Sequence, residues 1–382
     1  MTLYLDVSAG VNVQAGLGRY SRSLTRALLP YLETPPTLFY NQIRGRSQPI
    51  EGVAHCPSRV IPMGYKPWRL TVWMGQALRL NFQRLVPNAS LFHAHEHLLL
   101  PLRDTPTVLT VHDLIFKLFP EHHKSLNHIF LNRAMPLFVK RADAIITISL
   151  ASKRDLVTHY NVPPEKITVV YEAAAPDFAP PTPEAIARVR QHYQLPENYL
   201  LVVGTIEPRK NYSRLVTALM RLRERHIDLK LVVVGRKGWL YDEFFQTIRD
   251  LQAEEHVIFP GYVPDDDLPA VYGAATIAVM PSLYEGFGLP VLEAMACGTP
   301  VVSSDAASLP ELGGEVARYF APTDLEAMID TLQSVLDDDT LRQEMSAAGP
   351  AQAARFSWDR TAQETLAVYN KLVDRPFSNS LP

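Results

Sequence analysis

Two glutamates, Glu285 and Glu293, bracket a segment that reads EGFGLPVLE and follows an apolar stretch, TIAVMPS. Glycine adopts backbone conformations that are closed to other residues, and Pro290 suits the first turn of a helix, where its missing N–H costs nothing. The free amides of such a helix start, at the positive end of the helix dipole, form a site for phosphate oxygens. The residues expected to form this site are Gly286, Phe287, Gly288 and Leu289.

The two flanking glutamates have different expected roles. We expect Glu293 in the opening turn of the helix, where its carboxylate could accept hydrogen bonds from ribose hydroxyls beyond the phosphates. We expect Glu285 in the loop, where it could hold the hydroxyls of a sugar. The alternatives are a helix-dipole partner with a solvated loop glutamate, or the acid and carboxylate pair of a glycoside hydrolase.

A second candidate site follows the apolar stretch LLVVG, where the sequence reads GTIEPRKN. Adjacent Arg209 and Lys210, at a strand end and just before a helix, indicate that an anion binds there. Arginine can hold a phosphate through two parallel hydrogen bonds, and lysine adds a mobile point charge. The pair could also stabilise a departing diphosphate. The alternative is a surface basic pair, although cations near a helix N-terminus are slightly unfavourable.

A glycine pair, Gly16 and Gly18 in GLGRY, resembles a phosphate loop before a helix expected over about residues 19–32. We expect a flexible loop there, with a plain turn as the alternative. As a dinucleotide-binding fingerprint the pattern is incomplete, because Ser21 stands where the third glycine belongs and no acidic residue ends the next strand. An NAD-dependent dehydrogenase is therefore disfavoured.

Histidines gather at two predicted strand ends. His112 in TVHDL ends an apolar strand and could bind a sugar, with a structural histidine as the alternative. The segment FHAHEHLLLP carries His93, His95, Glu96 and His97, a spacing that could suggest metal ligands. A loop lining an acceptor accounts for this cluster well enough, so we expect no metal site.

The elements that must position these residues alternate between apolar strands and helical stretches, which predicts an α/β protein with parallel sheets covered on both faces. We expect residues 1–175 and 176–356 to form two Rossmann-like, doubly wound domains facing a central cleft, with a C-terminal helix at about 357–375 that returns to the first domain. The break lies at YEAAAPDFAPPTP, whose prolines suit a connector. Strands are expected at Thr2–Val7, Thr37–Tyr40, Leu91–Ala94, Thr107–Val111 and Ala144–Ile148, then at Leu200–Gly204, Lys230–Gly235, His256–Phe259, Thr276–Met280, Pro300–Ser303 and Ala317–Phe320.

The bulk properties are those of a globular protein with two cores. The chain has 382 residues, 47% of them hydrophobic and 20% charged, which is long enough for two domains. A net charge of −3 gives no general attraction to nucleic acid. Two cysteines without a disulfide framework indicate a reducing compartment, so we expect a cytoplasmic protein.

The segment 65–84, YKPWRLTVWMGQALRLNFQR, interleaves basic, aromatic and aliphatic residues. Such a helix could make a peripheral contact with the inner face of a membrane. An ordinary helix packed on the first sheet is the favoured interpretation.

Taken together, GLGRY, TVHDL, GTIEPRKN, PSLYEGFGLPVLEAMACGTPVV and SLPELGGE resemble the retaining glycosyltransferases of family 4, which have the GT-B fold. The resemblance covers nearly the whole chain and is densest from Leu200 to Ala321. It implies metal-independent transfer of a hexose from a nucleotide-sugar donor to a glycan or lipid-linked acceptor, with no cofactor. VHDL followed by FPE, and SLPELGGE, are most similar to mannosyltransferase-type members, so GDP-mannose is the expected donor.

Residue by residue, the resemblance implies a catalytic set of His112, Arg209, Lys210 and Glu285. It places the diphosphate on Arg209 and Lys210, the ribose on Glu293 and the donor sugar on Glu285. His112 resembles the family histidine beside the transferred sugar.

The glycine pair Gly16 and Gly18 matches the family loop near the phosphates and the acceptor. One departure is VYEAA at 170–174, where many members have Asn-Gly after the tyrosine. The alternatives to this function are a transferase that uses UDP- or dTDP-sugars, a nucleotide-sugar epimerase, and a non-catalytic sugar-nucleotide-binding protein.

Overall fold

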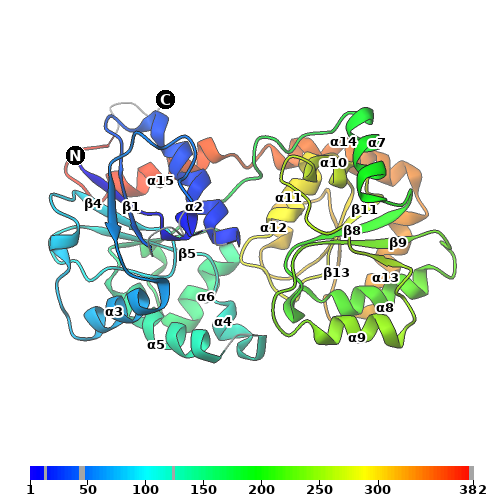
Figure 1. Cartoon of the computed structure of the whole chain (residues 1–382), viewed down its shortest axis with the longest axis horizontal. Coiled ribbons are helices and arrows are strands. Elements are labelled where there is room, and N and C mark those ends of the chain that lie inside the picture. Colours follow the sequence, from blue (N-terminus) through cyan, green and yellow to red (C-terminus); the bar gives the residue numbers. More distant parts are fainter. Residues whose placement is uncertain (13–14, 43–47, 123–124, 378–382) are drawn as a thin grey trace. The chain divides into compact units, whose positions relative to one another are not determined.

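The computed structural model describes residues 1–12, 15–42, 48–122 and 125–377. The chain divides into two compact units, the first made of Met1–Glu172 with Ser357–Pro382 and the second of Ala173–Phe356. Each unit is a parallel β-sheet with helices packed around it (Figure 1). The sequence placed the domain boundary after residue 175, and the chain leaves the first unit after Glu172.

The sheet of the first unit has seven strands within the described residues, in the order β3-β2-β1-β4-β5-β6-β7. All neighbouring pairs are parallel. The strand order reverses between β1 and β4, which makes a topological switch point. The strands are β1 (Leu3–Asp6), β2 (Thr37–Asn41), β3 (Ser58–Ile61), β4 (Leu91–Ala94), β5 (Thr107–Val111), β6 (Ala144–Thr147) and β7 (Ile167–Val169).

The sheet of the second unit has six strands in the order β10-β9-β8-β11-β12-β13, again parallel throughout. Its switch point lies between β8 and β11. The strands are β8 (Tyr199–Val203), β9 (Lys230–Val234), β10 (Val257–Ile258), β11 (Ile277–Met280), β12 (Val301–Ser304) and β13 (Arg318–Phe320).

Helices lie between most successive strands in both units. In the first unit they are α1 (Ser8–Val11), α2 (Ala15–Leu28), α3 (Tyr65–Ala77), α4 (Ile115–Leu118), α5 (Ser125–Arg141), α6 (Leu150–Tyr160) and α15 (Trp358–Asn370). In the second unit they are α7 (Pro183–Tyr193), α8 (Tyr212–Leu222), α9 (Asp242–Asp250), α10 (Leu268–Gly273), α11 (Leu289–Ala296), α12 (Leu309–Gly313), α13 (Leu325–Leu336) and α14 (Asp339–Ala353). Short 3₁₀ turns complete the connections at Leu29–Tyr31, Gln83–Leu85, Pro120–His122, Pro164–Lys166 and Pro208–Lys210.

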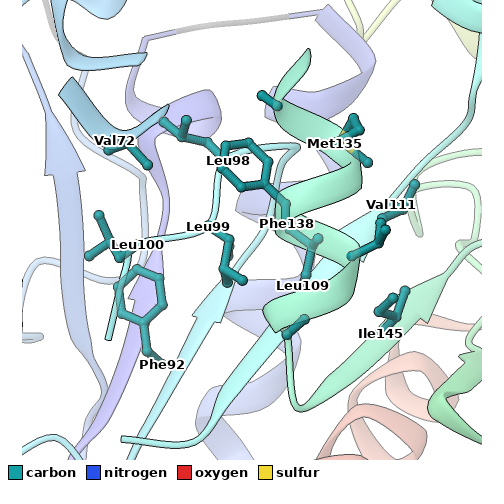
Figure 2. Packing of buried hydrophobic residues seen from close by; sticks show 14 of the residues in the cluster. Val72, Phe92, Leu98, Leu99, Leu100, Leu109, Val111, Met135, Phe138 and Ile145 are labelled. Atoms are coloured by element: carbon teal, nitrogen blue, oxygen red, sulfur yellow. The ribbon is translucent and has the colours of Figure 1, made fainter. Parts of the chain in front are cut away.

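Each core forms where an apolar strand meets the apolar stripe of a helix. All five residues of β5 are buried, as expected for a parallel strand covered on both faces. Figure 2 shows the ring of Phe138 of α5 beside Leu98, with Leu109 and Val111 of β5 in the same core. In the second unit, α8 buries residues at the three- and four-residue spacing of an amphipathic helix: Tyr212, Leu215, Val216, Leu219 and Leu222.

Every strand expected from the sequence is present, and two strands were missed. Strand β3 is an edge strand with Ser58 and Arg59 exposed, so it lacks an apolar run. Strand β7 has only three residues. The first helix was placed wrongly, because α2 begins at Ala15 rather than near Arg19. The C-terminal helix α15 packs beside α2 in the first unit (Figure 1).

Candidate active site

The loops that follow β8 and β11 meet at the switch point of the second unit. The Nζ atom of Lys210 donates a hydrogen bond of 2.7 Å to one oxygen of Glu285, and Nη1 of Arg209 lies 2.9 Å from the other. All three side chains are largely buried. The two motifs singled out from the sequence therefore form one cluster at the carboxyl edge of the sheet, where open α/β sheets bind ligands.

Two further polar residues complete this cluster. Glu207 pairs with Nη2 of Arg209, and the hydroxyl of Ser282 donates a hydrogen bond of 2.6 Å to Glu285. Two cations thus face two carboxylates, so the cluster is neutral without a ligand. An arriving diphosphate would have to compete with Glu285 for both cations.

The balance of charge keeps Glu285 ionised. Burial alone would raise the pKa of this carboxyl group, but Arg209 and Lys210 outweigh burial and hold the pKa at about 2. An ionised carboxylate can only accept hydrogen bonds, which is the property needed to hold sugar hydroxyls.

Gly288 stands at the start of α11, and the anion site expected there stays a prediction. Gly288 caps the helix with a φ of +115°, and a Cβ atom there would lie 2.6 Å from Cδ2 of Leu309. The hydroxyl of Ser308 fixes the loop, since its oxygen lies 2.5 Å from the carbonyl oxygen of Phe287 and 2.9 Å from that of Glu285, and its single proton is donated to one of them or shared. Gly286 is buried in the same loop but is not among the residues with positive φ, so the special conformation expected of both glycines is used at Gly288.

Glu293 lies one turn further along α11 than the sequence indicated. It is the fifth residue of the helix rather than a member of the opening turn, which contains no acidic residue. Its side chain is buried and accepts a hydrogen bond of 2.8 Å from the hydroxyl of Tyr272. A buried carboxylate beyond the first turn gains little from the helix dipole, so that alternative loses its support.

In the first unit, His112 follows β5 at the carboxyl edge of the sheet. Its Nε2 lies 2.9 Å from the carbonyl oxygen of His95, and its Nδ1 lies 3.3 Å from a carboxylate oxygen of Glu172. Both ring nitrogens therefore have internal acceptors. A hydrogen bond from the imidazole of His112 to a sugar would have to replace one of these two acceptors. That hydrogen bond stays a prediction.

The glycine pair does not form the loop expected from the sequence. Gly16 and Gly18 lie in the first turns of α2. Gly18 is buried, and a Cβ atom there would lie 2.9 Å from the carbonyl oxygen of Ala9 in α1. Close packing of α1 on α2 accounts for Gly18, whereas Gly16 is exposed and has open space around it.

The histidine cluster of β4 is engaged in hydrogen bonds. His93 bonds to the hydroxyls of Tyr369 and Thr110 at 2.5 and 2.8 Å. Burial lowers the pKa of His93 well below its ordinary value, and burial together with His112 lowers that of His95 to about 3. Within the described residues, no group of three or more potential ligands is arranged to hold a metal ion.

The first part of the basic segment 65–84 forms α3, which ends at Ala77 and packs on the first core. Trp68 and Val72 of α3 are buried in that core, while Leu70 and Met74 on the other side are about half exposed (49% and 47%). Among the described residues, no helix is both long and apolar enough to cross a membrane.

Comparison with known proteins adds an independent line of evidence. The family described as Glycosyl transferases group 1 matches residues 186–352, and Glycosyltransferase Family 4 matches residues 15–178. The O-antigen chain mannosyltransferase B of Escherichia coli is 37% identical over 275 residues, which cover 72% of this chain and 72% of that protein. The chain belongs to glycosyltransferase family 4.

Two other similarities extend this assignment. The serotype-specific mannosyltransferase WbdA of Escherichia coli is 31% identical over 286 residues, which cover 72% of this glycosyltransferase but only 35% of WbdA. The structure of sucrose-phosphate synthase from Thermosynechococcus elongatus matches with a TM-score of 0.78 at 21% identity, covering 97% of this chain and 99% of that one. This likeness establishes the GT-B fold.

Some partners of the site residues in this glycosyltransferase were not singled out from the sequence. They are Glu172, Glu207, Tyr272 and Ser282. Glu207 had a local signal, because it lies two residues from Arg209 at the same strand end. Tyr272 had none, since α10 brings it to Glu293 only through the fold.

Proposed function

We propose that this glycosyltransferase moves mannose from GDP-mannose to a glycan or lipid-linked acceptor with retention of anomeric configuration and without a metal ion. The mannosyl donor is supported by the two similar proteins, both named as mannosyltransferases. The observation that carries the proposal is the pairing of Arg209 and Lys210 with Glu285, in the loop that leads into the N-terminus of α11. Cations beside a free helix start suit a diphosphate.

Donor binding follows from competition within the cluster. The diphosphate would bind Arg209 and Lys210 and the amides at Gly288 and Leu289. Glu285, relieved of one or both cations, would accept hydrogen bonds from the hydroxyls of the mannose. The ribose would bind Glu293, which Tyr272 holds in place.

The chemical step is the departure of the nucleoside diphosphate. The C1–O bond breaks with oxocarbenium character, and Arg209 and Lys210 stabilise the charge that develops on the departing phosphate. The acceptor hydroxyl attacks C1 from the same face and gives its proton to that phosphate. Two fixed cations supply the charge that a metal ion supplies elsewhere, which is our reason for proposing metal independence.

A transfer assay tests this function directly. The enzyme is incubated with GDP-mannose, UDP-glucose or dTDP-glucose and a mannosyl glycoside, with either EDTA or Mg²⁺. We expect transfer from GDP-mannose alone, equal in both conditions, and an α-mannoside by NMR of the anomeric proton. A β-mannoside, another preferred donor, or activity lost in EDTA would contradict the respective part of the proposal.

We also propose a peripheral membrane contact through residues 65–84. Leu70, Met74 and Leu78 are exposed at four-residue spacing along and just beyond α3. On the neighbouring helix α5, Leu126 and Ile129 are exposed as well. Such an apolar face suits the interfacial region of a bilayer.

The charge around this face supports an anionic lipid surface. Between Tyr65 and His95 the sequence has four basic residues and no acidic one, and α5 carries no acidic residue either. The basic residues are Lys66, Arg69, Arg79 and Arg84. Juxtaposed apolar and basic side chains bind anionic membranes more tightly than neutral ones.

Vesicle flotation tests this contact. The protein is mixed with vesicles of phosphatidylcholine alone or with phosphatidylglycerol. We expect binding to the anionic vesicles that is lost when Leu70 and Met74 are both changed to serine. Ile227→Ser is the control, because Ile227 is an exposed apolar residue of the second unit. Binding that ignores the double change, or no binding to either vesicle, would contradict the contact.

A further inference from the structure

The imidazole of His112 lies between two oxygen acceptors. A carbonyl oxygen can only accept, so the Nε2 atom, 2.9 Å from the carbonyl of His95, must carry a proton. The Nδ1 atom lies 3.3 Å from Oε1 of Glu172, and both side chains are about 95% buried. An ionised carboxylate also only accepts, so a favourable contact requires a second proton on the ring.

The rest of the residue is held equally firmly. The backbone N–H of His112 donates to Nε2 of His97 at 3.0 Å, and its carbonyl oxygen accepts from the hydroxyl of Ser152 at 2.9 Å. The ring of Tyr20 packs edge-on against the imidazole, with 4.6 Å between centroids. These contacts fix which face and which nitrogen the ring presents to each neighbour.

We propose that Glu172 is a positioning residue that holds His112 in one orientation as a buried imidazolium, with Nε2–H available as a hydrogen-bond donor. This inference rests on the proposed function and adds to it the contact between His112 and the transferred sugar that the family resemblance implies. A sugar oxygen that takes the place of the His95 carbonyl would meet a charged N–H donor. A neutral ring protonated only at Nδ1 would instead present a lone pair.

Glu172, the partner of His112, lies where the chain passes from the first unit to the second. Glu172 is the last residue of the first unit before the chain continues at Ala173. The preceding residue, Tyr171, is anchored because its carbonyl oxygen accepts a hydrogen bond of 2.7 Å from Thr361 of α15. The carboxylate is thus placed by a fixed piece of backbone rather than by a free loop. It stands in VYEAA, where the sequence departs from many family members.

The surrounding charges agree with a protonated ring. Burial lowers the pKa of His112, but the hydrogen bond and charge of Glu172 raise it by more, so the net shift is upward. The other titratable groups whose charge or rings face His112 are His93, His95, Glu96, His97, Asp113 and Tyr20. His93 and His95 are neutral at pH 7, because their pKa values are lowered.

Glu172→Gln removes the negative charge of the side chain while keeping nearly the same shape. The glutamine amide can donate to Nδ1, which leaves His112 as the neutral tautomer with Nε2–H still donating to His95. We expect NMR of ring-labelled histidine in the full-length enzyme to show His112 titrating at lower pH than in the wild type. We also expect at least a tenfold lower kcat at pH 8, with the donor KM changed less than threefold. Activity should partly recover as the pH is lowered.

Two variants keep the test decisive. Glu172→Asp retains the charge, so its His112 titration and its kcat should be closer to those of the wild type than the values of Glu172→Gln are. It replaces Glu172→Gln if that variant fails to fold. Glu165→Gln, an exposed glutamate of the same unit, should change neither readout. The titration is measured without donor, so it decides the inference even if the proposed transfer fails. An unchanged His112 titration and an unchanged pH profile in Glu172→Gln would overturn it.

Discussion

Lys210 and Glu285 are 75 residues apart in the sequence, and their side chains meet at 2.7 Å. The contact joins the loops after β8 and β11, the two strands that flank the switch point of the second sheet. Glu285 contacts both Arg209 and Lys210, so the residues predicted to bind the sugar and the diphosphate separately form one cluster. In the proposed function, donor binding exchanges these ion pairs for new ones.

Removing Arg209 should impair catalysis more than folding. With Arg209→Ala, Lys210 still neutralises Glu285, whereas the departing diphosphate loses one of its two cations. We expect kcat to fall by about 100-fold. The melting temperature should also fall, because the buried carboxylate of Glu207 loses its cation, but the protein should stay folded at the assay temperature. Arg188→Ala is the control, because Arg188 is an exposed arginine of the same unit that also pairs with a carboxylate, that of Asp267. Unchanged turnover in a folded Arg209→Ala protein would contradict the assigned role.

The cluster also predicts how stability responds to acid. The pKa of Glu285 is about 2 in the folded protein, against an ordinary value of 4.5. A lowered carboxyl pKa stabilises the fold fully above the ordinary value, and this contribution, about 3 kcal/mol, disappears as the pH falls through 2. Lys210→Met removes one of the cations that lower the pKa of Glu285, so this stability should be lost at a higher pH than in the wild type. Urea unfolding at pH 7 and pH 3 measures it, and identical acid responses of both proteins would argue against the ion pair.

A second pH effect of opposite sign is expected in the first unit. Burial, followed by the nearby charge of Asp6, raises the pKa of Glu96 to about 7. A carboxyl group with a raised pKa makes the folded protein bind more protons than the unfolded chain, so stability falls as the pH rises from about 4.5 to 7. Glu96→Gln removes this penalty. We expect it to gain up to about 3 kcal/mol over the wild type at pH 8 and little at pH 4.

The measurement for Glu96 is chemical unfolding across this pH range. A variant that is equally or less stable than the wild type at pH 8 would show that Glu96 has a compensating partner in solution.

Gly288 should be required for both structure and donor binding. Gly288→Ala places a Cβ atom at a φ of +115° and 2.6 Å from Leu309, so we expect more than about 1 kcal/mol of destabilisation and weaker donor binding. Gly261→Ala is the matched control, with a φ of +84° but no atom near the added Cβ. Gly261→Ala should also be destabilised by the positive φ, but its affinity for the donor, measured by calorimetry, should be unchanged. Equal donor affinity in both variants would show that Gly288 has no role in donor binding.

The sequence predicted the sheets well because parallel strands covered on both faces are continuous apolar runs. It missed β3 and β7 because an exposed edge strand and a three-residue strand carry no such run. It placed Arg209, Lys210 and Glu285 at strand ends, and the topology then brought those ends together. Their pairing with one another depended on which strands are neighbours, which periodicity does not reveal.

Other features of the site were beyond sequence reasoning for local reasons. Gly18 was assigned to a phosphate loop because glycine spacing alone cannot distinguish a loop from close helix packing, and the structure places it against the backbone of Ala9. The partners Tyr272 and Glu172 lie on elements remote in sequence from Glu293 and His112. Only tertiary structure makes such pairs visible.

The most direct test of the central claim is a thermal-shift comparison of GDP, UDP, dTDP, ADP and NAD, each with Mg²⁺ or EDTA. We expect a shift with GDP that is the same in both conditions and is lost in Glu293→Ala. A shift only with NAD, a shift that requires Mg²⁺, or no shift with any nucleoside diphosphate would contradict the assignment of this cluster as the donor site.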